Sequence, residues 1–584
     1  MTNNSSEFNK NALRAIILCI VVVYVYNNMF LAPKRPVKPP QGAQVPNAQV
    51  AQPAAPATGL DSPVRPSGPA TVVGVPQQAP TTRPTLSQLQ SAGVTFIESD
   101  NVRLAISNLG ARAVGVALTR YMVRQGDENA LDLTSDLTGA PSPLGVYAGD
   151  ESDERVVYAL STVNGAPASS GSANLRVAPN TKVSVEFKGT LPSGTGITKT
   201  LTVSSGSYVI PVTVKLDRPL ASGQTVWVEW ARHFAKESSS RDAGLYHVTY
   251  LDGFNKIHHV DPKELSPELR DFGTSRWVAL GDLYFEATLI PTVAGRNTMI
   301  GFEKDIYTAR VAGASDGGNF SIYAGPKDYR TLEAVGDIEL ERSIDLGWFS
   351  FLALPLLWLL HYFYELLGNY GLAIIALTLL VKAVLLPLSK ASFESMRAMQ
   401  ELQPEIKALR ERIKDPNQLN QETFALYKRK GVNPMGGCLP MFIQIPVFLG
   451  LYQALLNSIE LRHSPFALWI TDLSSPEKLE LFGMGIPVMV LLMAASMIIQ
   501  TWTSPNPSAD PAQQKAMMIM PFVFAGMFII FPMPSGLVLY WLVNNIISII
   551  QQMYMRNTEK GSVYVGTLVA SVAIFGAGFI LTLI

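Results

Sequence analysis

The sequence of 584 residues contains few charged residues and very few cysteines. Asp, Glu, Lys and Arg make up only 16% of it, whereas roughly a quarter is typical of soluble proteins. The two cysteines, Cys19 and Cys438, are far apart and stand near no histidine cluster, which argues against a disulfide framework and a structural zinc site. The 46 basic and 46 acidic residues cancel, so the overall charge indicates no direct nucleic-acid partner.

The sequence also lacks the usual marks of an enzyme. No phosphate-binding loop of the form G-x-x-x-x-G-K-[ST] occurs, so the chain has no evident way to use ATP. His258 and His259 are adjacent, so on a strand they would point to opposite faces and could not bind one metal together. We therefore expect a protein that is not an enzyme and needs no cofactor.

The N-terminal region predicts a membrane anchor followed by a tether. Residues 1–32 include the apolar run Ala15–Tyr26, and no cleavage site of the A-x-A type follows it, which favours a retained anchor over a signal peptide. Lys10 and Arg14 precede the run and place the N-terminus in the cytoplasm. Thirteen prolines fall within residues 33–90, a composition typical of an extended, disordered linker.

Residues 91–342 show the pattern of short strands separated by turns. Apolar and polar residues alternate in Val183–Lys188 and in Tyr208–Leu216, and Gly194 and Gly206 belong to turn sequences. The pattern predicts one large all-β sandwich. The predicted fold class is thus a polytopic α-helical membrane protein with a large extracytoplasmic all-β domain.

The last third of the sequence is apolar enough to enter a membrane. Residues 343–370 are rich in apolar and aromatic residues but contain Pro355 and Glu365, which favours an amphipathic helix at the membrane surface. Residues 371–555 then predict a core of five spans, at 371–388, 437–456, 484–502, 517–533 and 536–554. Residues 563–584 carry no charge and are long enough for an additional C-terminal span across a core of ~30 Å.

The loop between the first two core spans, residues 389–434, determines the topology. It has nine basic residues against six acidic ones, which places it in the cytoplasm and residues 33–345 in the periplasm. Its apolar positions recur at steps of three and four residues on both sides of Asp415–Asn417, which favours a helical hairpin that docks partners over a plain solvated loop. The expected docking residues are Arg397, Lys407, Arg410, Arg412, Lys428 and Arg429.

Lys382 is the charged residue that most needs an explanation. A lysine near the middle of a span costs about 2.5–3.5 kcal/mol on insertion scales, so we expect it to face water or a partner. The alternative is that its long side chain reaches up to the membrane surface. Thr378 lies on the same helical face, and other spans offer Gln444, Gln500, Asn544, Asn545 and Gln551. These residues could line one wet cavity, or each could form a hydrogen bond between helices.

Four short motifs resemble those of the YidC-type membrane protein insertases. They are Asn433–Pro440 (NPMGGCLP), Gln444–Pro446 (QIP), Pro465–Trp469 (PFALW) and Pro534–Trp541 (PSGLVLYW). The anchor, the linker and the outer domain are similar to the Gram-negative form, whose periplasmic domain is a galactose-mutarotase-like supersandwich.

The resemblance implies a function. Insertases of this type insert and fold proteins of the bacterial inner membrane, alone or with the Sec translocon, through a hydrophilic groove that holds a basic residue. Lys382 matches that residue, which is arginine in many members, and Thr378, Tyr540 and Trp541 match positions that contact clients. The expected groove residues are Lys382, Thr378, Gln444, Asn544, Tyr540 and Trp541. The implied partners are nascent membrane proteins, the Sec translocon, membrane lipids and a ribosome docked on the hairpin.

The C-terminus departs from the family pattern, and two other functions fit the sequence. Many members end in a basic cytoplasmic tail, whereas here the apolar run 563–584 would take the C-terminus outside. One alternative function is a transporter that binds an anionic solute at Lys382, although we find no internal repeat of the kind common in transporters. The other is a sugar sensor or enzyme that uses the outer β domain.

Overall fold

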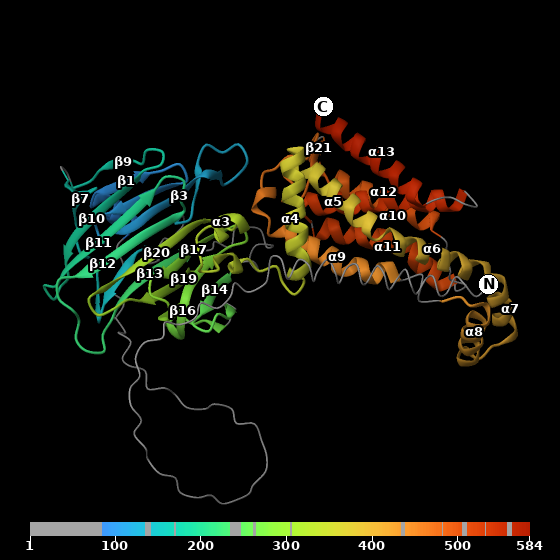
Figure 1. Ribbon diagram of the computed structural model, residues 1–584, viewed down its shortest axis with the longest axis horizontal. Coiled ribbons are helices and arrows are strands. Elements are labelled where there is room, and N and C mark those ends of the chain that lie inside the picture. The colour runs from blue at the N-terminus through green and yellow to red at the C-terminus, as the bar shows by residue number, and fades with distance from the viewer. Residues whose placement is uncertain are drawn as a thin grey trace, which may run out of the picture.

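The computed structural model describes residues 85–583, apart from 135–141, 169–170, 234–246, 261–263, 304–305, 434–438, 482, 505–510, 532 and 558–562. The predicted anchor and most of the predicted linker lie outside the described residues. The linker ends earlier than predicted, because helix α2 (Leu86–Ser91) begins after Thr85, whose hydroxyl caps the helix. A β domain and a helical bundle then lie end to end along the long axis of the molecule (Figure 1).

Two sheets pack face to face in the β domain. The small sheet has the order β4 (Ala130–Asp132), β3 (Arg112–Met122), β2 (Val102–Ser107), β1 (Val94–Glu98) and β9 (Asn174–Arg176). The large sheet has the order β6 (Glu151–Ser152), β5 (Gly145–Ala148), β13 (Val226–His233), β19 (Ile306–Ala312), β18 (Arg296–Glu303), β16 (Arg270–Gly281), β17 (Phe285–Pro291), β20 (Gly317–Pro326), β12 (Val209–Leu216), β11 (Gly196–Ser204), β10 (Lys182–Thr190), β7 (Ala159–Val163) and β8 (Ala166–Pro167). Strand β14 (His247–Asp252) pairs with β16 and with β15 (Ile257–Val260).

Alternation of side chains explains the sandwich. On β10, Val183, Val185 and Phe187 are buried, while the residues between them are more exposed. Val185 pairs with Leu201 on β11, and residues of both sheets share one apolar core. The two strands predicted at 183–188 and 208–216 are confirmed, and so is the all-β domain.

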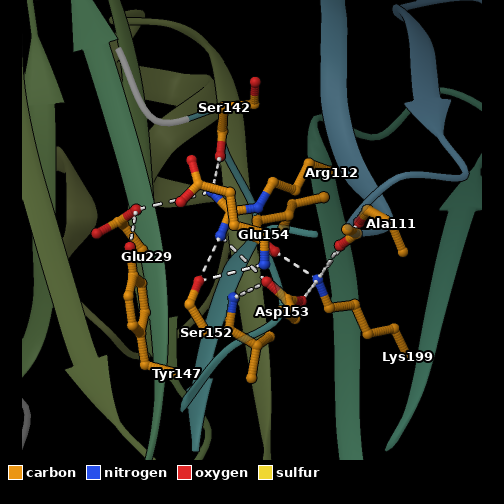
Figure 2. Close-up of polar contacts among 12 residues, drawn as sticks. Ala111, Arg112, Ser142, Tyr147, Ser152, Asp153, Glu154, Lys199 and Glu229 are labelled. Atoms are coloured by element: carbon orange, nitrogen blue, oxygen red, sulfur yellow. Dashed lines mark hydrogen bonds and ion pairs between the residues drawn. The ribbon is translucent and has the colours of Figure 1, made fainter. Parts of the chain in front are cut away.

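A group of buried ions joins the two sheets (Figure 2). Asp153, which is fully buried, accepts from Arg112 at 3.1 Å and from Lys199 at 2.5 Å. The Lys199 ammonium also donates to the backbone carbonyls of Gly110 at 2.6 Å and Leu144 at 2.7 Å. Burial lowers the pKa of Lys199 to about 8, although the negative charge of Asp153 acts in the other direction and raises it. The amine is therefore still charged at neutral pH.

Glu229 on β13 extends the group to the far side of Arg112. Its carboxylate accepts from Arg310 of β19 at 2.7 Å and from the hydroxyl of Tyr147 at 3.2 Å. Gly145 makes room for the guanidinium, because a Cβ atom there would stand 2.8 Å from an Arg112 nitrogen. Buried charges of this kind are tolerated only when each has its partners, so the group fixes how the strands are placed.

The β domain rests on the loop that follows helix α9. Ile459 is buried in the core of the β domain, although it belongs to the helical part of the sequence. The Arg462 guanidinium donates to the carbonyls of Met122 and Val123 at the end of β3, both at 2.8 Å. Nearby, His361 Nε2 lies 2.6 Å from Glu460 Oε1. The hydrogen bonds of Arg462 and the buried side chain of Ile459 therefore hold the two parts together, while the His361–Glu460 pair ties this loop to α4.

The helical part has these elements in chain order: α3 (Tyr329–Glu333), η3 (Leu340–Ser343), α4 (Ser350–Leu367), α5 (Tyr370–Val384), α6 (Leu386–Glu401), α7 (Gln403–Arg412), α8 (Pro416–Lys430), α9 (Leu439–Leu456), η5 (Ile459–Leu461), β21 (Leu479–Leu481), β22 (Met484–Ile486), α10 (Val488–Thr503), α11 (Pro511–Ile530), α12 (Ser535–Asn557) and α13 (Val563–Leu583). Helix α4 runs across the end of the bundle nearest the β domain, whereas α7 and α8 lie at the opposite end (Figure 1).

The bounds of several helices differ from the predicted spans. The span predicted at 371–388 breaks at Leu385, where α5 and α6 meet at a bend of 61°, and Pro387 opens α6 because it lacks an N–H to continue α5. The span predicted at 484–502 begins only at Val488, after strand β22 and Pro487. The first arm of the hairpin is divided at Leu402, in agreement with the kink that Pro404 predicts.

Among the described residues, two helices are long and apolar enough to cross a membrane. They are Ser350–Leu367 and Ser535–Tyr554, and the bent pair α5 and α6 would make a third. The remaining apolar helices are shorter in the described residues, at Ile443–Leu456, Val488–Thr503, Met518–Ile530 and Thr567–Thr582.

The first testable prediction concerns the buried ions. Replacing Lys199 with Met leaves Asp153 with less compensation for its buried charge, so the β domain should lose about 3–5 kcal/mol of stability. Hydrogen exchange of the purified full chain should show this as faster exchange in β3, β10 and β11.

Lys188→Met is the matched control, because Lys188 lies on neighbouring β10 and is 58% exposed at its side chain. Equal protection in the two variants would contradict the assignment of Lys199 as a structural ion.

Candidate functional site

The candidate site lies in the helical bundle around Lys382. The side chain of Lys382 leaves α5 near its end and is almost fully buried, with 8% of the residue exposed. Its ammonium donates to the hydroxyl of Ser548 on α12 at 2.8 Å. The lysine thus points across the bundle to another helix.

Thr378 lies one turn before Lys382 and is also buried, with 1% exposed. Its hydroxyl donates to the backbone carbonyl of Ile374 at 2.7 Å, the usual bond of a threonine within a helix. Ser548 in turn donates to the backbone carbonyl of Asn544 at 2.9 Å, and Asn544 itself is half-buried. Lys382, Ser548 and Asn544 therefore form one connected polar group.

A second polar contact joins α9 and α12. Gln444 donates its side-chain amide to the hydroxyl of Tyr540 at 2.5 Å, and Tyr540 is 2% exposed. Tyr540, Asn544 and Ser548 follow each other at steps of four residues, so all three lie on one face of α12. That face of α12 therefore carries both Tyr540, the partner of Gln444, and Ser548, the partner of Lys382.

Trp541 lies beside this face, in a cluster of aromatic rings. Its ring centre is 4.9 Å from that of Phe448 on α9 and 5.6 Å from those of Phe524 and Phe528 on α11. The contacts with Phe448 and Phe528 are edge to face, which is a favourable arrangement. Among the described residues, the Gln444–Tyr540 hydrogen bond and these rings join α9 and α11 to α12 along a line of contact that we call the seam.

Two further polar pairs bind α12 to its other neighbours. Asn545 donates to Ser496 on α10 at 3.0 Å, and Gln551 donates to Thr567 on α13 at 2.9 Å. Together with Lys382 and Gln444, they show polar side chains bonded from helix to helix. Sequence reasoning missed Ser548, Ser496 and the phenylalanines, because serine and phenylalanine are common in apolar helices and nothing in the sequence marks these ones.

The docking residues predicted in 389–434 lie on α6, α7 and α8, away from Lys382. Arg397, Lys407, Arg412, Lys428 and Arg429 are exposed, and Arg410 is half-buried. Leu402, Ile406 and Leu426 form a small core between the arms. Lys430 binds Glu405 across the arms at 2.7 Å, so the predicted hairpin is formed and its basic face is open.

Comparison with known proteins identifies the family. The model of the 60Kd inner membrane protein family matches residues 362–562, and that of the YidC periplasmic domain matches residues 95–359. The membrane protein insertase YidC of Geobacter metallireducens is 36% identical over 94% of this chain and 98% of its own length. That of Pelobacter propionicus is 35% identical over 94% of this chain and 99% of its own length.

The chain belongs to the YidC family of membrane protein insertases. Membership makes it one of a family of inner membrane proteins with a periplasmic domain, here the β domain. Among the relatives nothing supports the transporter alternative, which we set aside.

Solved structures resemble the chain only distantly. The crystal structure of an active YidC insertase with its first transmembrane domain resolved matches 80% of this chain and 95% of that chain, at 18% identity and a TM-score of 0.35. A galactose mutarotase-like protein from Lactobacillus casei matches 40% of this chain and all of that chain, at 10% identity and a TM-score of 0.24. Scores of this size carry no argument about the site.

The second prediction tests the seam between α9 and α12. Tyr540→Phe removes the hydroxyl that accepts from Gln444, so the variant should be less stable by about 0.6 kcal/mol and at most about 1.7, the range for hydrogen bonds between membrane helices. Unfolding of the detergent-solubilised chain in graded denaturing detergent measures the loss.

A double-mutant cycle supplies the control for this prediction. Gln444→Leu should cost little more in the Tyr540→Phe background, because the shared bond is already lost. Additive losses would mean that the two side chains do not interact.

Proposed function

We propose that the chain inserts client segments into the inner membrane through the seam between α9, α11 and α12, with Lys382 as the cation that receives them. The observation that carries the proposal is the buried ammonium of Lys382, bonded only to the neutral hydroxyl of Ser548 among the described residues. A buried cation without a counter-ion is costly, so an acidic or polar group of a client would stabilise it.

The seam is the part of the bundle best suited to open. Helix α9 packs mainly against α4 and only lightly against α12, and one neutral hydrogen bond and the rings around Trp541 close the gap. Thr378, Tyr540 and Lys382 are all buried, so a client reaches them only when these helices separate. The proposed groove residues would then line the opened seam.

Burial of the client in lipid supplies the driving force. The polar tail of the client would pair with Lys382 partway across the membrane, while its apolar segment leaves sideways through the seam. Burial of apolar area contributes about 25 cal/mol per Å², so a typical segment gains far more than the tail costs. No covalent bond forms or breaks in this sequence of steps.

The shape of the molecule supports the proposed topology. The β domain and the hairpin of α7 and α8 lie at opposite ends of the bundle, as expected for a periplasmic domain and a cytoplasmic arm (Figure 1). Helix α4 crosses the outer end of the bundle, which supports its placement along the membrane surface. Its length and composition would also allow it to cross the membrane. The N-terminus would lie in the cytoplasm.

The hairpin and the membrane face suggest the partners. Exposed basic residues on α6, α7 and α8 offer a docking surface to a ribosome that carries a nascent client, and Phe424, 64% exposed, adds an apolar contact. Lipids would cover the exposed apolar residues of α10, α11 and α13. The Sec translocon is a proposed partner through the family resemblance.

The third prediction tests the cation. Lys382→Ala should lower insertion of a small phage-coat-like client about ten- to a hundredfold, because a hydrogen bond to a charged group contributes about 1.5–3 kcal/mol. Lys382→Arg should retain insertion. The measurement is protease protection of the client in cells depleted of their own insertase.

Lys390→Ala is the matched control, since Lys390 lies two turns further on α6 and its side chain is 48% exposed. Normal insertion by Lys382→Ala, at equal protein levels, would count against the proposed role of the charge.

The fourth prediction concerns the additional helix α13. Its last residues lie at the end of the bundle that faces the β domain (Figure 1), so α13 would be a span that takes the C-terminus to the periplasm. Alkaline phosphatase fused after Ile584 should therefore be active, whereas a fusion after Asn557 should be inactive. Two inactive fusions would show that α13 does not cross the membrane.

A further inference from the structure

A cavity of about 240 Å³ lies where the β domain meets the helical bundle. Three separate parts of the chain line it: the β domain, the segment that leads into α4, and the end of α9. The lining residues are Leu283, Lys327, Asp345, Gly347, Tyr452, Gln453, Leu456 and Asn457. Polar groups of both charges thus meet at one hollow, well away from Lys382.

Lys327 supplies a positive charge that the protein satisfies only in part. The residue is 5% exposed, and among the described residues its ammonium makes one long hydrogen bond, 3.3 Å, to the backbone carbonyl of Asp282. An ammonium can donate three hydrogen bonds, so two donors are available to a ligand in the cavity. The carboxylates of Glu286, Asp282 and Asp345 and the guanidinium of Arg232 also act on this charge.

Asp345 supplies the opposite charge on another wall. It is exposed, and one of its oxygens accepts from the backbone N–H of Gly347 at 2.8 Å. A carboxylate has two oxygens and can accept several hydrogen bonds, so Asp345 can also take a donor from a ligand. The cavity therefore offers separate sites for a negative and a positive group of the same small molecule.

The position of the cavity indicates where that molecule comes from. Trp348, next to Gly347, is 90% exposed, and Phe351, Trp358 and Tyr362 of α4 are exposed as well. Trp358 and Tyr362 stack at 5.9 Å. Exposed aromatic residues of this kind gather at the membrane–water interface. Helix α4 runs across the outer end of the bundle (Figure 1), so its proposed placement at the membrane surface would put the cavity at the depth of the lipid headgroups.

We propose that this cavity binds the headgroup of a zwitterionic phospholipid with a primary ammonium group. The lipid phosphate accepts from Lys327, and its ammonium donates to Asp345. A quaternary ammonium has no N–H to donate, and Tyr452 is the one aromatic residue among the lining residues, too few for an aromatic cage. An anionic headgroup without an amine would leave Asp345 unpaired and face its negative charge.

A bound headgroup would join the two parts of the molecule. It would touch the β domain at Lys327, the segment before α4 at Asp345, and α9 at Gln453 and Asn457. The β domain would then be seated by lipid as well as by Ile459 and Arg462. This inference rests on the membrane placement of the chain and not on the proposed role of Lys382.

Native mass spectrometry of the full chain, released from nanodiscs with equal parts of phosphatidylethanolamine, phosphatidylcholine and phosphatidylglycerol, tests the proposal. The wild type should retain phosphatidylethanolamine at least fivefold over each of the others. Asp345→Asn should abolish the preference over phosphatidylcholine, and Gln453→Leu should weaken retention of all three. Glu333→Gln is the matched control, because it removes an exposed carboxylate of α3 outside the cavity.

Lys327 is buried near Glu286, so its removal could unfold the β domain, and Lys327→Arg, which keeps the charge, is used instead. It should bind the lipid within threefold of the wild type. Equal retention of the three lipids, or a preference that survives Asp345→Asn, would overturn the proposal.

Insertion is assayed with the same preparations. If the wild-type chain inserts clients but shows no lipid preference, the lipid proposal is contradicted and the proposed function is not. If the Lys382→Ala chain keeps its lipid preference but fails to insert clients, the result supports the role of Lys382 in insertion and leaves the lipid proposal unaffected.

Discussion

A polar side chain in the helical bundle must find its partner within the protein, because hydrocarbon offers none. Helix α12 supplies such partners to four other helices. Ser548 accepts from Lys382, Tyr540 accepts from Gln444, Asn545 donates to Ser496, and Gln551 donates to Thr567. Each pair joins α12 to a different helix, so the pairs together fix how α5, α9, α10 and α13 surround it.

The same constraint shows how far the sequence could predict the site. Lys382 and Tyr540 were predictable, since a charge in an apolar run and a family motif both stand out in one dimension. Ser548 was not, because a serine in a span is common and only packing decides which one meets the lysine. The break at Leu385 was missed for a similar reason: the apolar run continues to Leu388, although Pro387 ends the helix.

In the β domain, the alternation of apolar and polar residues predicts the strands but not the buried ions. Strands β10 and β12 followed from their alternating residues, because burial of one face leaves that mark. The ions Arg112, Asp153 and Lys199 come from strands and turns far apart in the sequence, and their pairing follows only from the way the strands fold together. From the sequence alone, a charged residue is expected at the surface, so the burial of these three ions could not be predicted.

The closed seam and the proposed function are compatible in energy. Separating α9 from α12 breaks one hydrogen bond between membrane helices, about 0.6 kcal/mol, and aromatic contacts of about 0.5–1.5 kcal/mol. A cost of about 1–2 kcal/mol leaves the open state populated at roughly 3–15%. The pairing of a client with Lys382 would then shift this population. The β domain, in contrast, is held by the buried ion pairs of Asp153 with Arg112 and Lys199. The bundle is thus most easily opened where its polar partners are neutral.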